Sequence, residues 1–145
     1  MLTTGYLNLN MNNLTDSKET QISAACLLLS VAEADEVLEI DELKIISDIL
    51  QDFFSINVNT SNDIMNKAKL LLKTSTGLFE FGKQLNQDFS HEDKIDFINC
   101  VFEVAFIDGK LHYLEHHTVK KIANILNLED KEIIAAKSVA KKYLN

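Results

Sequence analysis

Apolar residues recur every three or four positions along most of the chain, which is the spacing of the buried face of an α-helix. Between residues 16 and 33 this stripe consists of Ile22, Ala25, Leu28, Leu29 and Ala32. The same period predicts six more helices, which cover residues 40–53, a segment that opens at Thr60 or Ser61, and residues 77–85, 90–105, 112–126 and 129–144. The pattern therefore predicts an all-α protein, a compact bundle of about seven helices.

The periodic pattern divides the chain into two parts. Residues 1–15 are polar and rich in asparagine, and they are predicted to form a flexible N-terminal arm. Residues 16–145 are predicted to form one helical domain, since a chain of 145 residues can bury about two-thirds of its unfolded surface. The chain has no proline and only 4 glycines, too few turn-forming residues for an all-β protein with many hairpins.

The first pair of predicted helices resembles the fifth and sixth when the chain is shifted along itself by a constant offset. At this offset Asp35 aligns with Asp108, Leu38 with Leu111, and Glu42 with Glu115. Because only two copies are present, the pattern indicates a duplicated helical hairpin. The two hairpins are predicted to pack against each other with pseudo-two-fold symmetry.

Each hairpin carries acidic residues at both edges of its helix-to-helix turn. Asp35 and Asp108 follow the carboxyl end of a helix, where free carbonyl groups and the helix dipole disfavour an anion. Glu42 and Glu115 fall in the first turn of the next helix, where the dipole favours an anion. Two interpretations remain open. The carboxylates either accept hydrogen bonds within their own turns, or they supply oxygen ligands to a hard divalent cation such as Ca²⁺ or Mg²⁺.

The sequence VAFIDGKLHYLE, residues 104–115, and its degenerate copy VAEADEVLEIDE, residues 31–42, resemble the TerB family of bacterial tellurite-resistance proteins. The resemblance covers about residues 20–145. It implies an all-helical fold, a role in stress response, protein partners that are often membrane-associated, and acidic residues that bind divalent cations. Carried onto this chain, the candidate metal ligands are Asp35, Glu42, Asp108 and Glu115. The first copy departs from the family motif, since Glu36 stands where the second copy has Gly109.

The composition argues against nucleic acid and membrane as direct partners. The formal net charge is -8 and all 14 basic residues are lysines, so the bidentate arginine contacts common in nucleic-acid recognition are absent. No apolar run approaches the roughly 18 residues of a membrane span, and the N-terminus lacks the basic start and apolar run of an export signal. Cys26 and Cys100 lie in apolar runs and are expected to be buried free thiols. We therefore expect a cytoplasmic protein.

No arrangement of residues typical of catalysis is found, neither a nucleophile elbow nor a Gly-rich phosphate loop. His112 and His116 lie four residues apart on one predicted helix face, but a zinc site needs a third protein ligand, so Ca²⁺ or Mg²⁺ is favoured over Zn²⁺. We therefore expect a non-enzymatic module that binds a divalent cation and acts as a scaffold or sensor. The alternative is a pure protein-interaction module whose acidic turns are structural only.

Overall fold

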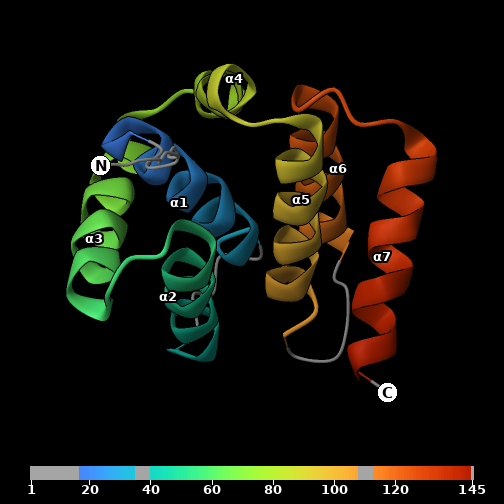
Figure 1. The fold of residues 1–145 in the computed structure, drawn as a ribbon, viewed down its shortest axis with the longest axis horizontal. Coiled ribbons are helices and arrows are strands. Elements are labelled where there is room, and N and C mark those ends of the chain that lie inside the picture. The colour runs from blue at the N-terminus through green and yellow to red at the C-terminus, as the bar shows by residue number, and fades with distance from the viewer. Residues whose placement is uncertain (1–16, 35–39, 108–112, 145) are drawn as a thin grey trace, which may run out of the picture.

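The computed structural model describes residues 17–34, 40–107 and 113–144, and these ranges contain seven helices and no strand (Figure 1). The helices are α1 (Lys18–Ala32), α2 (Ile40–Phe54), α3 (Val58–Thr74), α4 (Phe79–Asp88), α5 (His91–Ala105), α6 (Tyr113–Ile125) and α7 (Asp130–Leu144). The predicted all-α bundle is confirmed. The predicted arm, residues 1–15, lies outside the described residues.

The helices form two groups of three, α1–α3 and α5–α7, and α4 crosses between them at the top of the view (Figure 1). Within the first group every helix contacts the other two, whereas in the second group α5 contacts both α6 and α7. Helix α1 also contacts α4, α5 and α6, and α2 contacts α5. The two predicted hairpins, α1–α2 and α5–α6, therefore pack against each other. The pseudo-two-fold axis between them stays a prediction.

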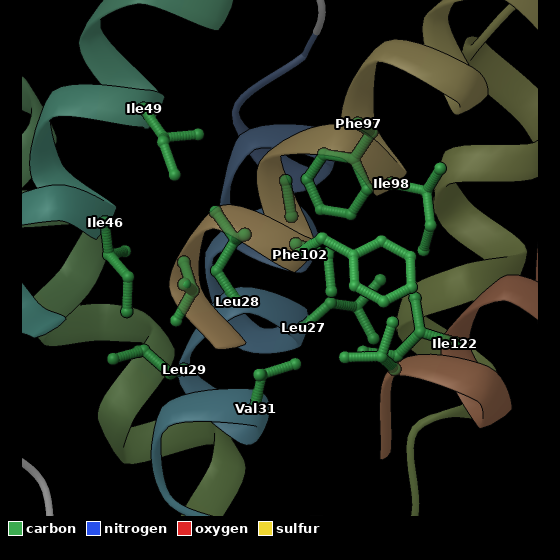
Figure 2. Packing of buried hydrophobic residues seen from close by; sticks show 14 of the residues in the cluster. Leu27, Leu28, Leu29, Val31, Ile46, Ile49, Phe97, Ile98, Phe102 and Ile122 are labelled. Atoms are coloured by element: carbon green, nitrogen blue, oxygen red, sulfur yellow. The ribbon is translucent and has the colours of Figure 1, made fainter. Parts of the chain in front are cut away.

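Helix α1 is the centre of the core. Every residue from Ala24 to Leu29 is fully buried, so this helix is covered on all sides and not along one stripe only. Around it, Phe102 of α5 lies beside Leu27 of α1 and Ile122 of α6 (Figure 2). Burying an aliphatic or aromatic side chain of this size contributes about 1.5–3 kcal/mol, so this cluster is the main source of stability.

Helices α1 and α5 end with the same backbone hydrogen bonds. The amides of Glu33 and Ala34 donate to the carbonyls of Leu29 and Val31 at 2.9 and 3.2 Å, and those of Phe106 and Ile107 donate to Phe102 and Val104 at 3.0 and 3.3 Å. These pairs correspond at the same offset that aligns the two acidic turns. Asp35 and Asp108 are the residues that follow in the two copies. The repeat is therefore present in the backbone up to the edge of each acidic turn.

Helices α2 and α6 also end alike, which extends the repeat beyond the predicted hairpin. Ser55 and Asn127 adopt the left-handed conformation with φ of 55° and 63°. After each of them an amide bonds to the carbonyl five residues earlier, Ile56 to Gln51 at 3.1 Å and Leu128 to Ala123 at 3.0 Å. This is the Schellman arrangement that closes a helix. Helices α3 and α7 then begin at corresponding residues, Val58 and Asp130, at an offset that is shorter by a single position. The repeated unit therefore comprises three helices.

Local capping explains where the helices begin. Ser90 and Asp93 form a capping box at the start of α5, in which the Ser90 hydroxyl accepts from the Asp93 amide at 3.1 Å and the Asp93 carboxylate accepts from the Ser90 amide at 3.4 Å. Helix α3 begins earlier than predicted, at Val58, because the side chain of Asn57 accepts a hydrogen bond from the Thr60 amide at 2.8 Å.

Candidate functional site

The four helices that flank the two acidic turns are packed together. Helix α1 leads into the first turn and α2 leaves it, while α5 leads into the second turn and α6 leaves it. The contacts of α1 with α5 and α6, and of α2 with α5, connect the two hairpins. The helices on both sides of each turn therefore belong to the same packed core. Asp35 and Asp108 themselves lie outside the described residues.

The structure places one of the four candidate carboxylates in full. Glu42, in the first turn of α2, is only 4% exposed, whereas its neighbour Asp41 is exposed. Glu42 also takes part in an interaction within the fold, so it is not a free buried charge. Glu115 lies in the first turn of α6, and its side chain is outside the described part of the structure. The sequence did not predict the burial of Glu42.

The two helices that lead into the acidic turns end without a basic residue. Because their last turns contain no lysine, no basic residue within α1 or α5 offsets the negative end of the helix dipole. Acidic residues begin the next helix, with Asp41 and Glu42 in the first turn of α2. A cation bound at either turn would be attracted both by the carbonyl ends and by the carboxylates.

Comparison with known proteins identifies the family of this chain. The family model described as "Tellurite resistance protein TerB" matches residues 21–138. The chain belongs to the TerB family. A protein of unknown function from Porphyromonas gingivalis has a similar crystal structure, with a TM-score of 0.67, 14% sequence identity, and coverage of 97% of this chain and 99% of that one. At this identity the likeness shows a shared fold. None of the curated proteins compared matches the chain significantly.

Within the described part of this TerB-family domain, no helix is both long enough and apolar enough to cross a membrane. The same residues contain no group of three or more His, Cys, Asp and Glu side chains that could hold a metal ion. The zinc pair considered from the sequence is described only at His116, because His112 lies outside the described residues. The candidate ligands Asp35 and Asp108, and the side chain of Glu115, lie outside the residues that were searched.

The two thiols of the TerB domain are poor nucleophiles. Burial raises the pKa of Cys26 to about 12, and its Sγ donates a weak hydrogen bond to the Ala68 carbonyl at 3.6 Å. Burial also raises the pKa of Cys100 to about 12, with further contributions from the carboxylates of Glu103, Asp96 and Asp52. Both side chains are free cysteines. At neutral pH they remain protonated and act as small apolar groups.

One group of polar residues was not predicted as a site. His116, Lys120 and Lys137 line a cavity of about 250 Å³ between α6 and α7, with Phe102 of α5 behind it. Burial lowers the pKa of His116, and the nearby Lys137 and Lys120 lower it further. Its Nδ1 is buried and has no hydrogen-bond partner among the described residues. From the sequence, His116 was considered only as one half of a zinc pair, and Lys120 and Lys137 were not predicted to line a site.

Proposed function

We propose that this TerB-family domain is a non-enzymatic, cytoplasmic module that binds a divalent cation through its acidic turns. It would act as a scaffold or sensor for a protein partner in a bacterial stress response, and that partner can itself be membrane-associated. The proposed ligands are Asp35 and Glu42 in the first turn, and Asp108 and Glu115 in the second. The observation that carries the proposal is the burial of Glu42 at the edge of its turn.

A buried carboxylate stays ionised only where donors or a cation compensate for its lost hydration. Glu42 takes part in an interaction within the fold, and metal-binding carboxylates typically have further interactions of this kind. The matching ends of α1 and α5 support two related sites, because Asp35 and Asp108 follow in sequence directly after helix ends with corresponding backbone hydrogen bonds. The carbonyl end of a helix without a basic residue adds to the attraction for a cation.

The chemistry of the donors favours Ca²⁺ or Mg²⁺. All four proposed ligands are carboxylates, which suit hard cations, whereas zinc sites are usually built with cysteine or histidine. The thiols of Cys26 and Cys100 lie in the interiors of α1 and α5, away from the turns. The raised pKa values of these thiols also support a non-enzymatic role, because neither supplies a thiolate at neutral pH.

Calorimetric titration of the metal-depleted protein with Ca²⁺, Mg²⁺, Mn²⁺ and Zn²⁺ tests the proposal. A cation that binds only the folded state stabilises it by about 2.7 kcal/mol at a hundred times its dissociation constant, so the melting temperature should rise with metal concentration. We expect this rise with Ca²⁺ or Mg²⁺. No heat of binding and no thermal shift at millimolar concentrations of any of the four ions would refute cation binding.

Paired substitutions assign the response to a turn. Asp108→Asn with Glu115→Gln should remove the thermal shift from the second site, and Asp35→Asn with Glu42→Gln should remove it from the first. Asp48→Asn is the matched control, because Asp48 is an exposed carboxylate on α2 and should leave the shift unchanged. Circular dichroism separates the two roles of the carboxylates. If a paired substitution unfolds the protein both with and without metal, the two carboxylates that it replaces are required for folding.

The second candidate function is a pure protein-interaction module, and it is favoured by apolar side chains on the surface. Leu70 of α3 and Phe79 of α4 are both more than half exposed. Such side chains are compatible with a partner surface, although isolated exposed apolar residues are common. If the metal titration is negative, the protein-interaction function is the remaining hypothesis. Substitution of the turn carboxylates should then change the stability of the fold, and neither the wild type nor the variants should respond to metal.

A further inference from the structure

A hollow lies between the second and third helices of each three-helix unit. In the first unit its lining includes Leu43, Ser47, Val58, Asn62 and Met65. In the second unit the corresponding positions line the cavity described above, and they are His116, Lys120, Asp130, Ile134 and Lys137. Residues of α2 correspond to residues of α6 at the same sequence offset that aligns the two acidic turns. Residues of α3 correspond to residues of α7 at an offset that is shorter by a single position. The duplication therefore places a hollow at the same point of both units.

The charged residues of the two hollows stand at different positions. The first hollow also has Lys44, Asp48 and Lys69 in its lining, and their counterparts in the second unit do not line the second hollow. In the second unit the lysines replace residues that are buried in the first. Ser47 is 9% exposed and Met65 is 5% exposed, and their counterparts are Lys120 and Lys137.

These two lysines are exceptions to an otherwise matching pattern of burial. Along α2 and α6 the buried residues Ile46, Ile49 and Leu50 correspond to the buried residues Val119, Ile122 and Ala123. Along α3 and α7 the buried residues Ser61, Ile64 and Ala68 correspond to the buried residues Ile133, Ala136 and Ala140. Both departures from the pattern are lysines, and both line the same cavity.

The substitutions change how the helices pack. In the first unit the Ser47 and Ser61 hydroxyls are hydrogen-bonded at 2.9 Å, and Ser61 also donates to the Ser47 carbonyl at 3.2 Å, so α2 and α3 are tied together. Lys120 and Ile133 occupy these positions in the second unit and form no such bond. Helices α6 and α7 accordingly have little direct backbone contact, and the cavity between them reaches Phe102 of α5.

We propose that this cavity binds a small organic carboxylate. Its anionic end would lie between Lys120 and Lys137, and its apolar part would cover Phe102, Ile133 and Ile134. Neither lysine forms an ion pair with a carboxylate of the described residues, so both cations are available. Asp130 is the one acidic residue in the described lining, so the two lysines outnumber the acidic residues there. The whole chain, in contrast, has a net charge of -8.

The size and the lining of the cavity define the ligand further. Its volume of about 250 Å³ is slightly below the range of about 300–1,000 Å³ that is typical of drug-sized ligands, so a short acyl chain or a single ring fits best. A fully polar anion such as phosphate would leave the apolar wall uncovered. An oxygen of the ligand could also accept a hydrogen bond from the buried Nδ1 of His116, which has no partner among the described residues.

An NMR titration of the full-length chain, treated with a chelating resin, tests this proposal. The probes are sodium benzoate and sodium hexanoate, with benzamide as the uncharged match and inorganic phosphate as the anion without an apolar part. We expect benzoate and hexanoate to shift backbone amides of α6 and α7 around the cavity. Benzamide and phosphate should each bind at least about tenfold more weakly, because each lacks one half of the interaction.

The decisive comparison is between the wild type and variants in which a cavity lysine is replaced by the corresponding residue of the first unit. Lys120→Ser and Lys137→Met should each weaken benzoate binding by about tenfold, which is the loss expected for a charged hydrogen bond. Both should fold, since their counterparts Ser47 and Met65 are accommodated in the first unit, and melting curves check this. Lys141→Ala is the control, because Lys141 is an exposed residue of α7 outside the cavity lining. Binding that is equal in all variants, equal for benzoate and benzamide, tighter for phosphate, or absent at tens of millimolar benzoate would overturn the proposal.

Discussion

Substitution of Gly82 by alanine isolates the contact between α4 and α6. A Cβ atom at Gly82 would lie 2.1 Å from Cγ2 of Ile125 and 3.2 Å from its Cβ, whereas carbon atoms in contact normally lie about 3.5–4.0 Å apart. The helices are also joined next to this point, because the Asn86 side chain donates to the Ile125 carbonyl at 2.9 Å. Ile125 is β-branched and has one strongly preferred rotamer in a helix, so its Cγ2 cannot turn away without cost.

Two opposing effects decide the size of the change. Alanine is favoured over glycine inside a helix by about 1 kcal/mol, whereas overpacking a tight contact typically costs about 1–3 kcal/mol. Because the overlap is large and involves a stiff side chain, we place the cost near the upper end of that range. Gly82→Ala should therefore lower the free energy of unfolding by about 1–2 kcal/mol, which corresponds to a decrease in melting temperature of about 2–8 °C for a domain of this size.

Urea and thermal unfolding followed by circular dichroism measure this change. Gly77→Ala is the matched control, because nothing lies within 4 Å of a Cβ at Gly77, and it should be neutral or slightly stabilising. Ile125→Ala removes the clashing methyl group, so the double variant should be more stable than the sum of the two single effects. If Gly82→Ala alone is more stable than the wild type by about the helix propensity of alanine, α4 and α6 do not pack as described.

Two further predictions concern titratable groups. The pKa of Glu132 is lowered by a hydrogen bond from the Glu129 amide and then by His91, whose Nε2 lies 2.5 Å from its carboxylate. This carboxylate therefore stabilises the fold at pH values above its unfolded pKa of about 4.3, and the stabilisation is lost as the pH falls through its lower folded pKa. The melting temperatures of wild type and Glu132→Gln should therefore converge between about pH 5 and pH 3. A difference in melting temperature that stays constant over this range would contradict the prediction. Cys26 is buried and Cys100 is partly buried, and both have pKa values raised to about 12. Both thiols of the native protein should therefore react with an aromatic disulfide reagent at pH 8 far more slowly than in urea, and equal rates would contradict the raised pKa values.

The helices could be predicted from the sequence because their apolar stripes and caps are local signals. The central position of α1 could not, since its predicted stripe did not include Ala24, Cys26 and Leu27, which α3, α4 and α5 help to cover. The start of α3 was predicted at Thr60 or Ser61 because several residues near it can cap a helix. The fold selects Asn57, whose side chain reaches the Thr60 amide.

The third helix of the repeat was hidden by a change of offset and of side-chain type. The offset shortens by a single position near the ends of α2 and α6, and Met65 corresponds to a lysine, Lys137. In the sequence Lys137 stands near Lys141 and Lys142, and lysines near the carboxyl end of a helix are typically solvated. Only the folded arrangement of α5, α6 and α7 shows that Lys137 lines a cavity. The burial of Glu42 was likewise invisible, because an acidic residue in a first helical turn is usually solvated.

Helix α7 is attached to the rest of the molecule chiefly through α5, whereas its counterpart α3 is held by both α1 and α2. Detaching α7 should therefore require less free energy than global unfolding, so its amides should exchange with solvent earlier than those of α1. Any molecule that bridges α6 and α7 would supply the attachment that the first unit obtains from its two serines. Binding in the cavity would then be coupled to the local unfolding of the carboxyl-terminal helix, and a bound ligand would slow its hydrogen exchange.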